Sequence, residues 1–321
     1  LFALVLLTIL ILNSSKPAAV EAQEPRDELD PATEAIFNAL TPEERVGQLF
    51  MISFEGNNID ANSNIAELIR NYRIGGVVLS AAKRNFSNNR TTLAQILALT
   101  HNLQALAQEK PPPNRVEETG EEVTPTPLAT STITSPVITE TIDIFTPMPL
   151  FISVAHEGDG FPYTNIRGLM DIPNQMALGA TWNGETARRV GTVVGQELSL
   201  LGINMLFGPS LDVLDNPRPE RGGSLGTRTF GGHPFWVGEL GQAYIEGVHQ
   251  GSNNKVLTIA KHFPGFGSSD REINQGVPTI LKSLDDLRRT ELPPFFKVTT
   301  LDPTNPDNTG GITDGLMTAH I

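Results

Sequence analysis

The sequence predicts an α/β fold built on a parallel sheet, from the order of its apolar segments and the position of its polar clusters. Short apolar runs typical of buried strands alternate with segments whose apolar residues recur at helical spacing. This alternation predicts repeated strand–helix units and therefore a parallel sheet. Polar and glycine-rich clusters follow several of the runs, at the carboxyl ends where α/β barrels build their sites.

The predicted elements follow one another along the chain. Thr41, Pro42 and Glu44 form a helix-start signal, with Thr as the cap and Pro at the first helical position. An apolar stretch follows over residues 46–54. Strands are predicted at 75–79, 150–155, 203–213 and 256–260, with the beginning of another at 315–321. Helices are predicted at 93–108, 186–201, 234–249 and 284–297, and the last contains a pair of prolines.

Composition narrows the range of functions. The net charge is -13, which disfavours nucleic acid as a partner because phosphate contacts need clustered Lys and Arg. Cysteine is absent, so disulfides, a thiol nucleophile and thiolate metal sites are excluded. The histidines show no metal-ligand spacing and no phosphate-binding glycine loop occurs, so no metal and no cofactor are expected.

The first residues predict the compartment. An apolar run over 1–12 is too short to span a bilayer comfortably, and small residues follow it up to Ala22. Residues 1–25 are therefore predicted to be a signal peptide or an N-terminal membrane anchor, which implies a protein secreted or held on the outer face of the cytoplasmic membrane. Residues 26–321 are predicted to form the barrel, with a Thr/Pro-rich low-complexity insert at 110–149.

Three clusters carry the chemistry, at 155–160, 204–231 and 261–267. In the third, Lys261 and His262 directly follow an apolar strand. Sugar hydroxyls need directional donors and acceptors, and this pair supplies several. Taken alone, the pair is also compatible with the solvated start of a loop.

The clusters together resemble glycoside hydrolase family 3, in particular its N-terminal domain and the bacterial β-N-acetylhexosaminidase branch. KHFPGFG at 261–267 is similar to the family's Lys-His-Phe-Pro-Gly-x-Gly signature. Segments at 40–54, 74–79, 149–160, 176–183, 195–213, 227–231 and 316–321 resemble further family segments in the family's order. The resemblance implies a TIM-type (β/α)8 barrel that is C-terminally truncated in this chain.

The resemblance also implies residue roles. Lys261 and His262 match the pair that grips the sugar, Arg228 matches a sugar-contacting arginine, and Asp212 matches an aspartate near the same pocket. For Asp212 and Arg228, a structural salt bridge between two loops is the alternative. The family's first sugar-binding aspartate falls at Ala155, whose methyl group accepts no hydrogen bond, so that contact is absent unless His156 or Asp159 replaces it.

The catalytic groups depart most from the family. An Asp-x-His dyad supplies the general acid in this branch, and those positions are Glu272 and Asn274 here. Asn carries no proton that it could donate near neutral pH, so Glu272 or Asp270 is predicted to act directly as the acid, with ordinary loop carboxylates as the alternative. A retaining mechanism needs a carboxylate nucleophile, which the resemblance places beyond Ile321.

These predictions favour a retaining glycosidase that removes terminal β-linked N-acetylhexosamine from carbohydrate or peptidoglycan-derived glycans, as in peptidoglycan turnover. A β-glucosidase-type exo-glycosidase of the same family, whose acid would come from a later domain, is one alternative. A non-catalytic carbohydrate-binding or scaffold protein on the cell surface is the other, and Ala155 and Asn274 favour it.

Overall fold

The sheet is entirely parallel, and its strands lie in chain order. The computed structural model describes residues 30–109, 147–158, 166–215, 225–271, 276–301, 303–304 and 309–321. Within them the sheet has six strands in the order β1-β2-β3-β4-β5-β6, joined by helices, which is the arrangement of a TIM-type barrel and confirms the predicted α/β class. The strands are β1 (Met51–Ser53), β2 (Gly76–Val78), β3 (Phe151–Val154), β4 (Met205–Leu206), β5 (Leu257–Phe263) and β6 (Gly315–Thr318).

Helices follow the strands, and local sequence signals explain where several of them begin. Thr41 and Glu44 form the predicted capping box, in which each side chain accepts a hydrogen bond from the other residue's backbone N–H. The first, third and fifth helices were not predicted. The helices are α1 (Pro31–Ala39), α2 (Pro42–Gly47), α3 (Asn64–Tyr72), α4 (Thr92–Gln108), α5 (Gln175–Gly179), α6 (Gly184–Leu200), α7 (Pro234–Ser252), α8 (Leu284–Arg289) and α9 (Leu292–Thr299), with a short 3-10 helix, η2 (Gly226–Arg228).

Two predicted boundaries were wrong, and proline is part of the reason for both. The regular strand within the predicted 203–213 is only β4, and the chain meets the sheet again at Ser210, in a bridge to Lys261. Pro209, just before this bridge, has no N–H to give a sheet ladder. The helix predicted at 284–297 is two helices. Pro293 and Pro294 are tolerated only in a first turn, so α9 begins just before them.

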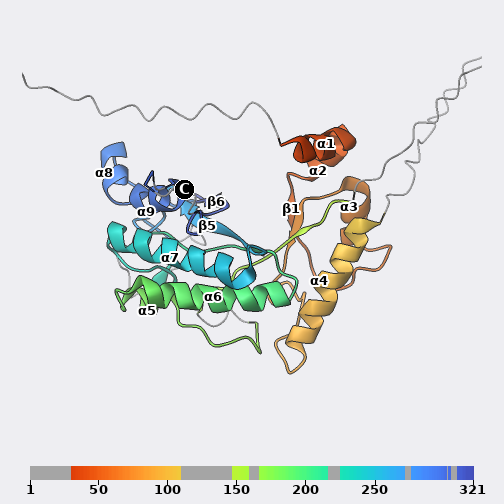
Figure 1. Cartoon of the computed structure of the whole chain (residues 1–321), viewed down its shortest axis with the longest axis horizontal. Coiled ribbons are helices and arrows are strands. Elements are labelled where there is room, and N and C mark those ends of the chain that lie inside the picture. Colours follow the sequence, from red (N-terminus) through yellow and green to blue (C-terminus); the bar gives the residue numbers. More distant parts are fainter. Residues whose placement is uncertain are drawn as a thin grey trace, which may run out of the picture.

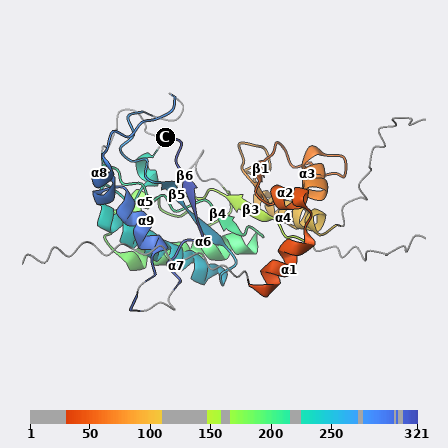
Figure 2. The same ribbon diagram turned by 90° about the horizontal axis from the view of Figure 1, so that it is seen from above.

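Helices α6 and α7 lie side by side at unusually close range (Figure 1). Glycines on both helices make this possible. A side chain at Gly195 would collide with the carbonyl oxygen of Val248, and one at Gly247 would collide with that of Arg188. Figure 2 shows the same pair from above, with α7 and α9 beside β5. The two backbones are therefore in direct contact, which fixes their separation.

The predicted insert at 110–149 lies outside the described residues, except for its last three. Its flanks are joined, because Gln104 of α4 accepts from the N–H of Leu150 at 3.0 Å and donates to the Leu150 carbonyl at 2.9 Å. The chain leaves at the end of α4 and returns at the amino end of β3, opposite the strand ends where a barrel site is expected.

Residues 1–25, predicted as a signal peptide or anchor, lie outside the described part of the chain. Among the helices that the structure describes, none combines the length and apolar character needed to cross a membrane.

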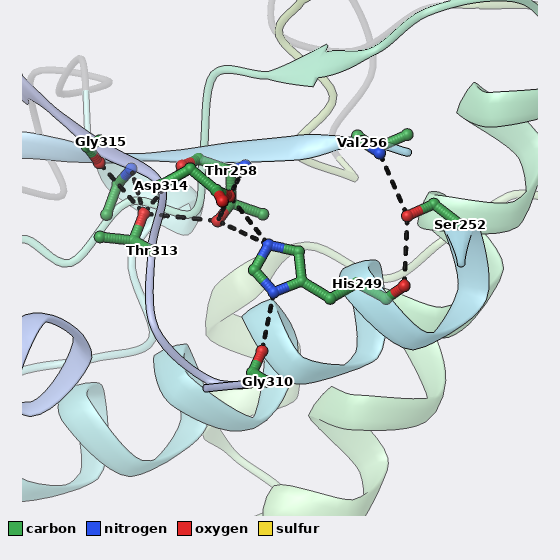
Figure 3. Close-up of polar contacts among 9 residues, drawn as sticks. His249, Ser252, Val256, Thr258, Gly310, Thr313, Asp314 and Gly315 are labelled. Carbon is green, nitrogen blue, oxygen red and sulfur yellow. Dashed lines mark hydrogen bonds and ion pairs between the residues drawn. The ribbon is translucent and has the colours of Figure 1, made fainter. Parts of the chain in front are cut away.

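A histidine on α7 ties the amino ends of β5 and β6 together (Figure 3). Nδ1 of His249 lies 2.8 Å from the Gly310 carbonyl, and Nε2 lies 2.9 Å from Oδ2 of Asp314. Both partners can only accept, so the imidazole must carry both protons. Burial alone would lower the pKa of His249, but the hydrogen bonds to Asp314 and Gly310 outweigh it and raise the pKa.

Replacing His249 with Leu is expected to reduce the free energy of unfolding by about 1–3 kcal/mol at low pH, since hydrogen bonds of a charged group are lost. A raised folded-state pKa stabilises the protein fully below the unfolded pKa of about 6.5, and this contribution disappears as the pH rises through the folded-state value. Urea unfolding at about pH 5.5 and about pH 8.5 measures it. A loss of the same size at both pH values would contradict the charged state. His101→Leu, on the exposed face of α4, is the matched control.

Candidate active site

The carboxyl ends of β3, β4 and β5 bring the chemically active side chains together. Glu157 follows β3, Asp212 follows β4, and Lys261 and His262 lie near the carboxyl end of β5. These strands are neighbours in one parallel sheet, so their carboxyl ends meet at one edge. Arg228 enters from η2, which packs against α5.

Glu157 is the centre of a buried ion cluster. Its carboxylate pairs with Lys261 through Nζ and with Arg228 through Nε, and Nη2 of Arg228 donates to its second oxygen at 3.1 Å. Only 2% of the Glu157 side chain and 4% of the Lys261 side chain are exposed. Two cations therefore share one carboxylate in the interior.

The charges within this cluster shift one another's protonation. Burial would raise the pKa of Glu157, but Lys261 and Arg228 outweigh it and lower the pKa, so the carboxylate stays ionised. Burial lowers the pKa of the Lys261 ammonium, and Arg228 lowers it further while Glu157 opposes both. The result is an ionised carboxylate that holds two cations in fixed places.

Asp212 and His262 form a second buried pair. Nδ1 of His262 lies 2.7 Å from Oδ2 of Asp212, which also accepts from Ser210 Oγ at 2.7 Å. The other oxygen accepts from the N–H of Phe266 at 2.7 Å. Burial would raise the pKa of Asp212, but these hydrogen bonds outweigh it and lower the pKa.

The pairing orients the imidazole of His262. Because Asp212 accepts from Nδ1–H, the other ring nitrogen is left to meet a ligand. The His262 side chain is 17% exposed, whereas Asp212 is fully buried. For Asp212 and Arg228, a structural salt bridge between two loops was the alternative to sugar binding. Asp212 pairs with His262 and Arg228 pairs with Glu157, so the two are not paired with each other.

His156, which was predicted as a possible replacement for the contact that Ala155 lacks, is buried. Ala155 itself is exposed at the end of β3. Neither ring nitrogen of His156 has a hydrogen-bond partner among the described residues, and burial lowers its pKa to about 4. The imidazole is therefore neutral. Its predicted contact with the sugar stays a prediction, and Asp159 lies outside the described residues.

Of the two predicted acids, Glu272 lies outside the described residues and Asp270 is poorly suited to the role. Asp270 is ion-paired with Arg271 at 2.6 Å and accepts from the N–H of Thr279 at 2.7 Å. The Arg271 hydrogen bond and the Thr279 N–H lower the pKa of Asp270 to about 2. A general acid must hold its proton at the working pH, so the geometry gives Asp270 a structural role in joining the two sides of its loop.

Sequence reasoning missed the role of Glu157. The residue lies inside the predicted 155–160 cluster, but no function was predicted for it. A signal was available, since an acidic residue at one strand end and basic residues in two neighbouring segments are natural partners. Among the described residues, no group of three or more His, Asp or Glu side chains is arranged to hold a metal ion.

The fold and this cluster define the class: a TIM-type barrel with a polar site at the carboxyl ends of its strands. Residues 119–304 match the family described as the glycosyl hydrolase family 3 N terminal domain. The chain belongs to this family.

Proteins with a similar sequence are named beta-hexosaminidases. The chain is 28% identical over 260 residues to beta-hexosaminidase A of Pseudoalteromonas piscicida, covering 80% of this chain and 34% of that protein. It is 30% identical over 173 residues to the beta-hexosaminidase of Pseudomonas aeruginosa PAO1, covering 54% of this chain and 46% of that one. The chain thus spans between a third and a half of the length of these relatives.

Solved structures with a similar fold come from the same group of proteins. A family 3 beta-N-acetylglucosaminidase from Paenibacillus matches with a TM-score of 0.64 and 28% identity, over 88% of this chain and 42% of that one. NagZ from Neisseria gonorrhoeae, in complex with N-trifluoroacetyl-D-glucosamine, matches with a TM-score of 0.57 and 25% identity, over 84% and 62%. These similarities support the barrel fold.

Proposed function

We propose that this chain belongs to a retaining exo-glycosidase that hydrolyses terminal β-linked N-acetylhexosamine in carbohydrate or peptidoglycan-derived substrates. The observation that carries the proposal is the Lys261–His262 pair at the end of β5, held by two buried carboxylates. The names of the relatives support the same activity, since they are beta-hexosaminidases and beta-N-acetylglucosaminidases.

In this proposal the described side chains bind the sugar rather than break the bond. Glu157 fixes the ammonium of Lys261 and the guanidinium of Arg228, both of which are donors to sugar hydroxyls. Asp212 fixes the orientation of the His262 ring through Nδ1, and Nε2 of that ring then forms a hydrogen bond with a further hydroxyl of the sugar. Side chains that are already held in place lose little conformational entropy when a ligand binds. They also keep the bound sugar, and therefore the glycosidic bond, in one position.

The general acid is proposed to be Glu272, since Asn274 cannot donate a proton and Asp270 is held ionised. Glu272→Gln is expected to slow cleavage of a substrate with a poor leaving group by about 100-fold or more, because only that leaving oxygen needs the proton. An activated aryl glycoside is expected to lose much less. The kcat/KM values of the two substrates measure this.

Asp270→Asn is the matched control for Glu272→Gln. The side chain of Asp270 joins the two sides of its loop through Thr279, so its loss is expected to affect both substrates alike. Equal losses on both substrates for Glu272→Gln would rule out the acid role.

The experiment that tests the proposed function compares two aryl substrates with the full-length gene product. Faster cleavage of the β-N-acetylglucosaminide than of the β-glucoside supports the proposal. Preference for the glucoside would identify a β-glucosidase-type enzyme instead. Binding of N-acetylglucosamine without cleavage of either substrate would favour a surface carbohydrate-binding or scaffold protein, to which the loss of an acceptor at Ala155 points.

We also propose that the protein acts outside the cytoplasm, secreted or anchored on the outer face of the cytoplasmic membrane. The apolar run over 1–12 and the small residues after it support this location. Cell-wall glycan fragments are the matching substrates in that compartment. Fractionation of cells followed by sequencing of the protein's N-terminus tests both the location and a cleavage near Ala22.

A further inference from the structure

A second buried carboxylate holds the loop that follows Lys261 and His262, on the side away from Asp212. Glu291 directly precedes α9, and its side chain is completely buried. Its Oε1 accepts from Ser268 Oγ at 2.7 Å and from Lys282 Nζ at 3.0 Å. The carboxylate therefore links the loop at 264–268 to the beginning of a helix in the barrel wall.

The second oxygen of this carboxylate lies against the backbone of the same loop. A Cβ placed on Gly265 would lie 2.6 Å from Glu291 Oε2, and Gly265 has a φ of +135° that other residues rarely adopt. Oε2 has no hydrogen-bond partner among the described residues. The loop is thus packed directly on the carboxylate, and glycine is required there both for space and for conformation.

Lys282 supplies the counter-charge. Besides Glu291, its ammonium donates to Asp215 Oδ2 at 2.8 Å and to Thr290 Oγ1 at 2.9 Å. Burial would lower the pKa of Lys282, but the hydrogen bonds to Asp215 and Glu291 outweigh it and raise the pKa. A buried carboxyl group is costly without such a partner, and the Lys282 ammonium provides one for Glu291 at 3.0 Å.

The opposite side of the loop rests on Asp212 and its neighbour. The N–H of Phe266 donates to Asp212, and a side chain at Gly267 would collide with the carbonyl oxygen of Val213. The loop therefore lies between two buried carboxylates, Asp212 on the side of His262 and Glu291 behind it. A shift of the loop away from Glu291 would move Phe266 and loosen the pair formed by Asp212 and His262.

We propose that Glu291, with its partners Ser268 and Lys282, is a positioning residue for the sugar-binding pair Lys261–His262. It does not touch the sugar; it holds the loop that keeps Phe266 on Asp212 and so keeps the ring of His262 in place. This inference rests on the proposed glycosidase function for its kinetic consequence, whereas its structural part is independent of that function.

The test uses two variants of the full-length protein, Ser268→Ala and Glu291→Gln. The first removes only one hydroxyl, and the second keeps an acceptor oxygen for Ser268 but removes the charge that Lys282 compensates. Ser199→Ala is the matched control, because Ser199 Oγ donates only to a backbone carbonyl on the exposed side of α6. Hydrogen exchange at the Phe266 amide and the KM for an aryl β-N-acetylglucosaminide are measured on all three.

Both test variants are expected to speed exchange at Phe266 by about tenfold or more, the effect of losing one hydrogen bond to a charged group, without changing exchange in α6 and α7. KM is expected to rise by a similar factor with a smaller change in kcat. Unchanged exchange at Phe266, or an equal increase throughout the protein, would overturn the proposal. If the unmodified protein cleaves neither aryl substrate, the proposed function fails, but exchange at Phe266 still decides the role of Glu291.

Discussion

Glu157→Gln is expected to lower the free energy of unfolding by about 3 kcal/mol or more, because it leaves the ammonium of Lys261 and the guanidinium of Arg228 without their buried counter-charge. The glutamine keeps the size and one acceptor oxygen, so the loss reports the charge rather than a cavity. Denaturant unfolding at neutral pH measures it, and the slope with denaturant shows whether the folded state itself has changed.

The matched control is Glu185→Gln on α6. Glu185 also pairs with an arginine, Arg188, but half of its side chain is exposed. Surface ion pairs contribute little because water solvates both partners, so no measurable loss is expected there. Equal changes at the two positions would mean that burial of the Glu157 cluster does not decide its contribution, and the role given to Glu157 would be wrong.

Asp212→Asn is expected to lower kcat/KM for an aryl β-N-acetylglucosaminide by about 100-fold, the effect of misplacing a bound substrate by about 1 Å. The carboxylate accepts from His262 Nδ1, Ser210 Oγ and the N–H of Phe266. An amide can donate to Nδ1 of His262 instead, which reverses the tautomer of the ring and changes what its other nitrogen offers the sugar.

Steady-state kinetics of Asp212→Asn should be compared with Asp285→Asn, which changes a strongly exposed carboxylate on α8. The exposed variant is expected to match the unmodified protein. If Asp212→Asn keeps full activity while folding normally, the Asp212–His262 pair is not part of sugar binding. A loss of activity in both variants would point to a general effect of charge.

Local signals predicted the local structure well. The capping box at Thr41 and Glu44 needs only residues three apart, so it could be recognised without knowing the fold. The alternation of strands and helices likewise predicted a parallel sheet. Boundaries were wrong where the place of a segment in the fold decided its structure, as after Leu206, where β4 ends and the chain meets the sheet again only at Ser210, two residues before Asp212.

The site was predicted in its residues but not in its pairings. The family resemblance indicated Lys261, His262, Arg228 and Asp212, and all four lie together. The pairing of Glu157 with Lys261 and Arg228 depends on the fold, which brings the end of β3, the end of β5 and η2 together. The role of Glu291 was still harder to predict from the sequence, because Glu291 lies in a different segment of the chain from the loop that it supports.

The buried glycines between α6 and α7 have an effect beyond the contact between the two helices. Helix α6 leads into β4 and α7 leads into β5, so the distance between the helices also sets the distance between the segments that carry Asp212 and His262. A methyl group added at Gly195 or Gly247, in the helix layer outside the strands, would push α6 and α7 apart. We expect this to shift Asp212 and His262 relative to each other. In a chimera built from two family members, α6 and α7 should therefore be exchanged together, as one inherited unit.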